Sequence, residues 1–415
     1  MRLLGLAPLL CALVAPVIAS APAAAAPAAA APAAPAANVD FDFAMYGALR
    51  ARAQDGNLFA SPASMREALG IAYLGAHGTT ADEMVTALHL DADRTKAVSQ
   101  AKDELAGFQA ARGASQLSIA NRLWADQAFK MNDSFTRDAR DAFGAPVETV
   151  DFLRSPNAAR LTINGWVETQ TNGKIKDLLA PPAVTSNTSL VITNAIWFKG
   201  TWEKTFAKTA TNDAPFHVDA TTNVDVPMMH QTAVFSYAAV PTAGMKVLEM
   251  PYGKSDLAMD VLLPDDPTGL SKIEEKLTSR SFVTWTSALA KQRVAVSFPK
   301  VKITWGGSVK PELQKLGMRT AFVERAADFT GIADIAARDA GKNLFVSDVV
   351  HKAFVAIDEE GTEAAAATGV VMATAATSFE LPPVRFDADH PFVFVIRDVK
   401  RGRVLFMGRV NNPKA

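Results

Sequence analysis

Histidine is the side chain most often used for proton transfer and metal binding near neutral pH. The chain has six, and none of them is spaced as a metal-binding motif: His77, His89, His217, His230, His351 and His390. The G-x-S-x-G, Walker and G-x-G-x-x-G motifs are also absent from the sequence. The sequence therefore gives no support for a catalytic residue, a metal site or a cofactor, although a catalytic Ser–His pair can also form between residues far apart in sequence.

Two polar side chains interrupt strongly apolar runs. Asn194 lies within LVITNAIWF, residues 190–198, and His351 lies within LFVSDVVHKAFVAI, residues 344–357. Buried polar groups are almost always hydrogen-bonded, so one interpretation is a satisfied polar pair in a core. A second is a polar network that must open and close. A third, an exported hydrolase that uses Ser61 or another serine with His351, needs an exposed imidazole, and the apolar context predicts a buried one.

The first half of the chain carries the start and stop signals of helices. Ser61–Pro62 and Ser155–Pro156 each pair an N-cap residue with a first-turn proline, and apolar residues follow at helical spacing. Thr80 and Glu83 have the capping-box spacing, which predicts the start of another helix. Asn172–Gly173 is a stop signal for the helix that follows Ser155.

From residue 190 onward the pattern changes to apolar runs of strand length, separated by Pro, Gly and Asp. The runs are LVITNAIWF (190–198), MKVLEM (245–250), LAMDVLLP (257–264), VAVSFPKVKI (294–303), AFVAID (353–358), FVFVIRD (392–398) and VLFMGRV (404–410). Helices first and strands later, without alternation of the two, predict an α+β fold.

The N-terminus has the pattern of a secretory signal peptide over residues 1–25. Its apolar stretch is too short, and too interrupted by Pro, to span a bilayer. Residues 26–39 continue an Ala/Pro-rich run, which predicts an extended linker outside the fold. Cys11, the only cysteine, lies in the signal. We therefore expect a secreted protein, extracellular or periplasmic, with a single disulfide-free domain over residues 40–415.

Charge supports neither a nucleic-acid partner nor a membrane surface. The 42 Lys and Arg residues nearly balance the 43 Asp and Glu residues, and no basic block of five or six residues occurs. Two glycosylation sequons, at 132–134 and 187–189, have meaning only in a eukaryotic secretory pathway.

The segment EEGTEAAAATGVVMATAA, residues 359–376, has the composition of a strand without an anchor. It turns at Gly361, carries no charge after Glu363, and has no Pro to keep it out of a sheet. Every second residue from Thr362 is uncharged, as is required of side chains that would face a core: Thr362, Ala364, Ala366, Thr368, Val370 and Met372. Such a segment suits both an exposed loop and a buried strand.

Several segments together resemble the signature regions of the serpins, the serine protease inhibitors. They occur in the family's order and span essentially all of residues 40–415: NLFASPASMREALGIAYLGAHGTTADEM, INGWVETQTNGKIKDLL, LVITNAIWFKGTWEKTF, VSFPKVKI, HKAFVAIDEEGTEAAAATGVVM and DHPFVFVIRD followed by VLFMGRVNNP. The resemblance implies three β-sheets, about nine helices and an exposed reactive-centre loop. It also implies an inhibitor rather than an enzyme, whose cleaved loop inserts into the central sheet while the target serine protease is held as a covalent acyl-enzyme.

The resemblance also implies roles for individual residues. The family's shutter, which lies beneath the point where the sheet parts, is matched by Ser61, Ser64, Asn194 and His351. Trp202, in FKGTW, matches the breach at the top of that sheet. The hinge of the loop comprises Glu359, Glu360, Gly361, Thr362, Glu363, Ala364, Ala365, Ala366, Ala367 and Thr368. In the uncut molecule, the strand that begins at Thr362 is expected to be excluded from the sheet.

The spacing usual in the family places the reactive bond between Ala375 and Ala376, fourteen positions after Gly361. A small residue before the bond suits the shallow apolar pockets of elastase-like or subtilisin-like proteases and offers nothing to a trypsin-like pocket. An alternative alignment puts Phe379 before the bond, which would favour chymotrypsin-like targets. A monomeric inhibitor is expected, and a non-inhibitory serpin acting as carrier or chaperone is the alternative within the family.

Overall fold

The computed structural model describes residues 37–114, 116–144, 147–253, 255–334, 343–362 and 381–415. In this part of the chain there are nine α-helices: α1 (Ala37–Ala53), α2 (Pro62–Tyr73), α3 (Gly78–Leu88), α4 (Arg94–Ala114), α5 (Asp133–Phe143), α6 (Pro156–Gln170), α7 (Leu270–Lys276), α8 (Ser279–Ser287) and α9 (Lys310–Lys315). Two short 3-10 helices, η1 (Lys208–Ala210) and η2 (Thr320–Phe322), accompany them. Helix α1 begins at Ala37, inside the range expected to be linker.

Three sheets are formed by the described residues. The first has nine strands in the order β1-β17-β16-β9-β8-β7-β10-β15, with β6 on β7. Their bounds are β1 (Leu58–Ala60), β6 (Thr211–His217), β7 (Asn223–Val240), β8 (Met245–Pro251), β9 (Leu257–Pro264), β10 (Ala290–Pro299), β15 (Val384–Asp387), β16 (Phe392–Asp398) and β17 (Arg403–Val410).

The second sheet has six strands in the order β11-β13-β14-β5-β2-β4, and a third small sheet pairs β12 with β3. Their bounds are β2 (Gln116–Asp126), β3 (Lys130–Met131), β4 (Val147–Val150), β5 (Leu190–Thr201), β11 (Val301–Ser308), β12 (Ala333–Asp334), β13 (Val346–Asp358) and β14 (Gly361–Thr362). The α+β class expected from the sequence, and the three sheets and about nine helices implied by the resemblance, are confirmed in this part of the chain.

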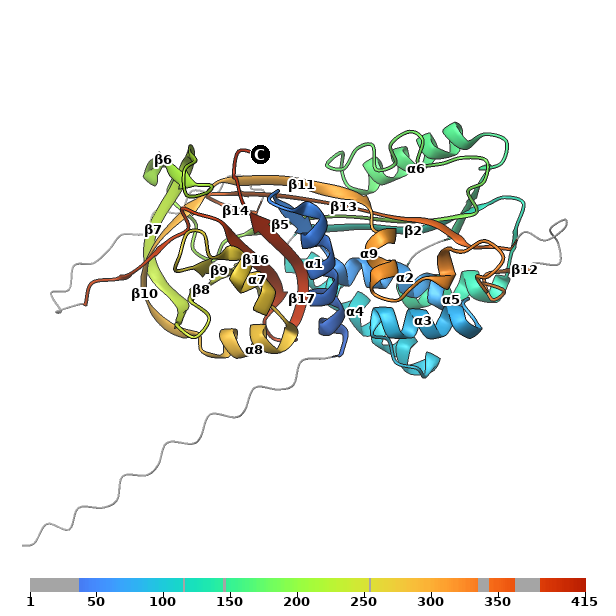
Figure 1. Ribbon diagram of the computed structural model, residues 1–415, viewed down its shortest axis with the longest axis horizontal. Helices are drawn as coiled ribbons and strands as arrows, with labels where there is room; N and C mark the ends of the chain where they lie inside the picture. The colour runs from blue at the N-terminus through green and yellow to red at the C-terminus, as the bar shows by residue number, and fades with distance from the viewer. Residues whose placement is uncertain (1–36, 115, 145–146, 254, 335–342, 363–380) are drawn as a thin grey trace, which may run out of the picture. The chain divides into compact units, whose positions relative to one another are not determined.

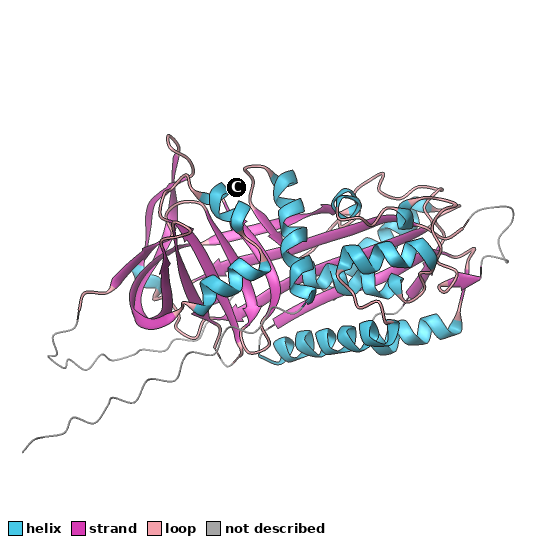
Figure 2. Ribbon diagram, turned by 60° about the horizontal axis from the view of Figure 1, so that its bottom comes forward, coloured by secondary structure: helices cyan, strands magenta, loops and turns pink. Residues whose placement is uncertain are grey.

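Both faces of the six-stranded sheet are covered. Helix α6 lies over one face, and α2, α3, α5 and α9 lie on the other side (Figure 1). Ile163 and Val167 of α6 pack with Trp124 and Trp197 of the sheet in one buried cluster. Figure 2 shows the helices gathered around one part of the long strands, whereas the nine-stranded end is mainly strand. Because other elements cover both faces, strand β5 is buried along almost its whole length, as its unbroken apolar run predicted.

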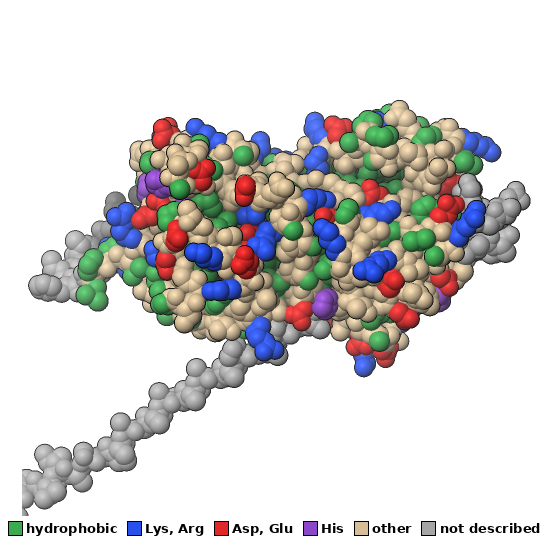
Figure 3. Space-filling model, viewed as in Figure 1, with side chains coloured by type: hydrophobic (Ala, Val, Ile, Leu, Met, Phe, Trp, Pro, Cys, Tyr) green, Lys and Arg blue, Asp and Glu red, His purple; other side chains and the backbone are tan. Residues whose placement is uncertain are grey.

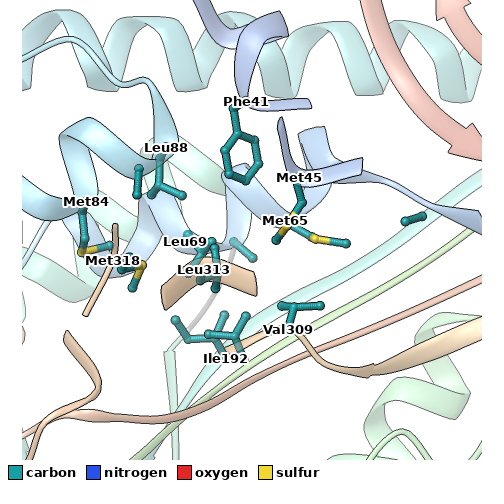
Figure 4. Packing of buried hydrophobic residues seen from close by; sticks show 14 of the residues in the cluster. Phe41, Met45, Met65, Leu69, Met84, Leu88, Ile192, Val309, Leu313 and Met318 are labelled. Atoms are coloured by element: carbon teal, nitrogen blue, oxygen red, sulfur yellow. The ribbon is translucent and has the colours of Figure 1, made fainter. Parts of the chain in front are cut away.

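The cluster between the helices and the sheet holds α2 against β5. Figure 4 shows side chains from α1, α2, α3 and α9 in one cluster, with Ile192 of β5 beside Leu313 of α9. Met65 and Leu69 of α2 are fully buried in this cluster, and so are Phe41 and Met45 of α1. The start of α2 is therefore fixed beneath the middle of the six-stranded sheet.

Two helix starts match their sequence signals. The Ser61 hydroxyl accepts a hydrogen bond from the Ser64 N–H at 3.3 Å, and Pro62 occupies the first turn of α2. Helix α6 begins at Pro156 after Ser155 and ends before Asn172, which has a positive φ.

The capping box predicted for Thr80 and Glu83 is wrong. Helix α3 begins at Gly78, so both residues lie inside it. Thr80 Oγ1 accepts from the Asp328 N–H at 2.9 Å, and Glu83 Oε2 accepts from the Arg319 N–H at 2.8 Å. Tertiary partners far along the chain have taken the place of the local cap.

The described surface shows the mixture of positive and negative charge that the composition predicted. Basic and acidic side chains are interspersed on the face seen in Figure 3. Among the helices that the structure describes, none has the length and apolarity needed to cross a bilayer. The same residues contain no group of three or more His, Cys, Asp or Glu side chains able to hold a metal ion.

Candidate functional site

Strands β13 and β5 form the line along which the six-stranded sheet could part. They are parallel and pair directly from Val346 opposite Leu190 to Phe354 opposite Trp197, with His351 directly opposite Asn194. Parallel neighbours joined by a ladder leave no space for another strand between them. Over this length the sheet is closed.

Above that line, the short strand β14 lies between the same two strands. Thr362 pairs with Ile357 of β13 on one side and with Gly200 of β5 on the other. Gly361 has a φ of 147°, and a Cβ there would lie 2.0 Å from the Gly200 carbonyl oxygen. Only glycine fits this position, because both the backbone conformation and the contact exclude a side chain.

Thr362 corrects one expectation. It is fully buried, and its hydroxyl lies 2.8 Å from the hydroxyl of Tyr252. The strand expected to be excluded from the sheet therefore already lies in it at its first residue, Thr362, together with Gly361 just before it. The paired length of β13 and β5 begins just beneath, so further entry requires these strands to separate.

The four residues predicted for the shutter meet on the paired length. Ser61 and Ser64 lie at the start of α2, Asn194 on β5 and His351 on β13, and all four are completely buried. Asn194 Nδ2 donates to Ser64 Oγ at 2.6 Å, and its Oδ1 accepts from His351 Nδ1. The Ser61 N–H donates to His351 Nε2 at 3.4 Å. These contacts join β5, β13 and α2 across the line of parting.

The same contacts fix the tautomer of His351 and rule against a hydrolytic Ser–His pair at this place. An amide oxygen can only accept, so Nδ1 carries the proton and Nε2 is the acceptor. Ser61 Oγ donates to the Leu405 carbonyl at 2.7 Å and not to the imidazole. Burial, with a contribution from the positive charge of Arg52, lowers the pKa of His351 to about 3. The imidazole is thus neutral and structural.

The uncut protein should lose stability as the pH falls below 6.5. The unfolded chain protonates His351 near its ordinary pKa of 6.5 while the folded protein resists until about 3. The unfolded state therefore binds more protons, and this group alone should remove about 1 kcal/mol between pH 7 and pH 5.5. Urea unfolding of the wild type and of His351→Gln at both pH values measures it. An equal pH dependence in the two proteins would show that His351 does not titrate in this way.

Trp202 lies at the top of the sheet, as predicted for the breach. Its indole Nε1 donates to the Asp358 carbonyl at 3.1 Å, and its backbone N–H donates to the Glu360 carbonyl at 2.9 Å. The ring stacks on Tyr252 with centroids 4.6 Å apart. Trp202 therefore contacts the turn that leads into β14 and also packs in the core; its role in the breach stays a prediction.

Charged side chains fix the first hinge residues beside Trp202, at the top of the sheet. The Glu359 carboxylate accepts from Lys300 at 3.0 Å and from the Thr211 hydroxyl at 2.9 Å. Burial opposes ionisation, but these hydrogen bonds and that of its own backbone N–H lower the pKa of Glu359 overall. Glu360 pairs with Lys208 at 2.9 Å. The end of β13 is thus fixed on both sides before the chain turns at Gly361.

Two residues of the site were not foreseen. Asn121 of β2 lies beside the shutter and accepts from Asn194 Nδ2, while Tyr252 lies between Trp202 and Thr362. A polar residue in the run QLSIANRLWAD was the available signal for Asn121. No local pattern marks Tyr252, because its partners lie 50 to 110 positions away.

The remaining predicted residues lie outside the described part of the chain. They are Glu363, Ala364, Ala365, Ala366, Ala367 and Thr368 of the hinge, Ala375 and Ala376 of the reactive bond, and Phe379. Their roles stay predictions.

Comparison with known proteins adds to this geometry. A family model described as serpin (serine protease inhibitor) matches residues 36–413. The chain is 40% identical over 391 residues to leukocyte elastase inhibitor of Sus scrofa, covering 91% of this chain and 99% of that protein. It is 38% identical over 384 residues to the Bos taurus protein of the same name, with the same coverage.

Solved structures give the same result. Serpin48 of the insect Tenebrio molitor matches with a TM-score of 0.80 at 32% identity, covering 91% of this chain and 97% of that one. Uncleaved ovalbumin matches with a TM-score of 0.81 at 29% identity, covering 91% and 99%. The similarity therefore spans the whole described fold, including the strands of the parting line.

Proposed function

The chain belongs to the serpin family, a family of serine protease inhibitors, and on that premise we propose that it traps its target protease by inserting its own cleaved loop. The observation that carries this proposal is the position of β14. Two residues of the loop are already paired at the top of a sheet whose strands β13 and β5 pair with each other from Phe354 and Trp197 downward. The simplest movement for the loop segment that follows Thr362 is to enter the sheet between the same two strands.

The chemistry is that of an interrupted proteolysis. The protease serine attacks the carbonyl carbon of the residue before the reactive bond, the peptide bond breaks, and the new amine leaves with the C-terminal fragment. An ester joins the protease to the freed end of the loop. If the loop then enters between β5 and β13, it carries the attached protease away from the place where the bond was cut. The ester between the two proteins stays intact. The inhibitor is consumed and is proposed to act as a monomer.

Target class follows from the residues proposed at the bond. With Ala375 before the bond and Ala376 after it, the protease needs a shallow apolar pocket, as in elastase-like or subtilisin-like enzymes. The names of the mammalian relatives, leukocyte elastase inhibitors, support an elastase-like target. The N-terminal sequence supports secretion, to the extracellular space or a periplasm, as a further proposal.

Wild-type protein should inhibit an elastase-like protease at close to one inhibitor per enzyme and leave trypsin active. Ala375→Arg should reverse this preference by at least tenfold in association rate, because only a basic side chain reaches the charge in a trypsin-like pocket. Progress curves with both proteases measure the rates.

The released C-terminal fragment locates the bond by mass spectrometry. A fragment that begins at Ala376 supports the assignment, and one that begins at Glu380 moves it to Phe379. Ala375→Gly serves as the matched control, since it changes the same position without adding charge.

A further inference from the structure

The hydrogen-bond chain of the shutter does not end at Asn194. His351 Nδ1 donates to Asn194 Oδ1, and Asn194 Nδ2 donates to Asn121 Oδ1. Asn121 Nδ2 then donates to Glu67 Oε2 at 3.2 Å. Each link donates in the same direction, from β13 through β5 and β2 to a carboxylate on α2. Chains of this kind polarise one another and gain strength cooperatively.

Glu67 sets the direction of the chain. A side-chain amide can be turned over at little change in shape, exchanging its donor and acceptor ends, whereas an ionised carboxylate can only accept. With Glu67 present, the nitrogen of Asn121 must face α2 and its oxygen must face Asn194. The reverse orientation would set two oxygens against each other at Glu67 and two NH2 groups against each other at Asn194. The Ser64 carbonyl, which accepts from Asn194 Nδ2 at 3.2 Å and more weakly from Asn121 Nδ2 at 3.4 Å, favours the same orientation. Glu67 adds the acceptor at the end of the chain, and through Asn121 it helps to orient both amides.

Glu67 lies in a buried cluster of ionisable side chains. Glu67 is 3% exposed, and its neighbour Arg66 is 4% exposed. Arg66 bonds Asp42 of α1 at 3.3 Å and Glu104 of α4 at 2.9 Å. Burial lowers the Arg66 pKa, but the carboxylates of Glu104, Asp42 and, with a smaller contribution, Glu67 raise it overall. Helices α1, α2 and α4 thus fix the end of the chain from three sides.

We propose that Glu67 is a positioning residue for the parting of the sheet: by orienting Asn121, it keeps Asn194 aligned to hold His351 and so slows entry of the loop before cleavage. This inference rests on the proposed function, since it concerns the timing of the same insertion. The residue touches neither the loop nor the protease. It acts through the amides of Asn121 and Asn194.

Isosteric variants test the proposal without changing packing. Asn121→Asp replaces the donor that faces Glu67 by an oxygen, and it should raise the rate of spontaneous loop entry at least fivefold. Adding Glu67→Gln restores a donor–acceptor pair in the opposite sense, and the double variant should return to within twofold of the wild type. Glu67→Gln alone should also lie within twofold, because its amide oxygen can still accept from Asn121.

Glu104→Gln is the matched control. It alters the same cluster of ionisable side chains from α4, where Glu104 bonds Arg66 at 2.9 Å, and it leaves Asn121 and Glu67 unchanged. The rate is followed in uncut protein held below its unfolding temperature, as the appearance of a urea-resistant species on gradient gels. This readout needs no protease, so a wild type that fails to inhibit would count against the proposed function and not against this inference.

Two results would overturn the proposal. The first is an equal rate of spontaneous loop entry in Asn121→Asp and Glu104→Gln. The other is a double variant as fast as Asn121→Asp, because a role in packing or total charge alone would give no rescue by reversal of polarity.

Discussion

Cleavage near Ala375 is expected to raise the midpoint of thermal unfolding by tens of degrees. In the uncut protein, only Gly361 and Thr362 of the described residues after the turn lie between β13 and β5. Cleavage frees one end of the segment, so that it can separate these strands and pair with both. The polypeptide is the same before and after the cut apart from one peptide bond, and the difference in stability reports the insertion itself.

The size of the effect follows from the hydrogen bonds gained. About a dozen residues each adding a net ~1 kcal/mol give on the order of 10 kcal/mol before the ordering of the loop is subtracted. Even a fraction of this is large, since each kcal/mol shifts the midpoint by a few degrees. Calorimetry of uncut and cleaved protein, side by side, measures it.

A cut elsewhere provides the control. Nicking an ordinary surface loop adds freedom to the unfolded chain and leaves stability unchanged or lowered. Protein nicked in the turn between β6 and β7, residues 218–222, should therefore unfold at or below the midpoint of the intact chain. If protein cleaved near Ala375 behaves in the same way, the loop does not insert.

Thr362→Arg should convert the protein from an inhibitor into a substrate. The wild-type side chain is completely buried and its hydroxyl contacts Tyr252 at 2.8 Å. An arginine would have to bury a charge beside that hydroxyl, at a cost of several kcal/mol. The first pairs of the inserting strand would be lost, while the reactive bond remains accessible to the protease.

The expected result is at least tenfold more inhibitor consumed per protease inactivated. Thr362→Ser is the matched control, because it keeps the hydroxyl that meets Tyr252 and should stay near the wild-type stoichiometry. Titration of a fixed amount of active protease with each variant gives the values. A wild-type stoichiometry in Thr362→Arg would mean that entry does not begin at this residue.

Most of the fold could be predicted from local pattern. The buried run of β5 and the N-caps at Ser61 and Ser155 are signals that require no knowledge of distant partners. Strand β2 was not foreseen, because QLSIANRLWAD mixes polar and apolar residues without strict alternation. The capping box at Thr80 failed because distant backbone N–H groups of the chain bind the same side chains.

In the site, too, some features could be predicted from local sequence and others depend on distant partners. Asn194 and His351 stand out in sequence because each interrupts an apolar run, but the donor–acceptor direction between them depends on atoms of four separate elements. The resemblance identified the hinge, yet the entry of Gly361 and Thr362 into the sheet follows from the fit of a glycine against the Gly200 carbonyl. Neither Asn121 nor Glu67 could be placed beside the shutter from composition, because their contacts join strands and helices far apart in the chain.

The most direct test of the account is whether the protein forms a covalent complex with its protease. Wild-type protein is mixed with an elastase-like serine protease, denatured, and separated by electrophoresis. We predict a band at the sum of the protease and the inhibitor without its C-terminal fragment, which survives denaturant and disappears when the protease serine is blocked beforehand. Cleaved inhibitor and free protease as the only products would contradict the trapping mechanism.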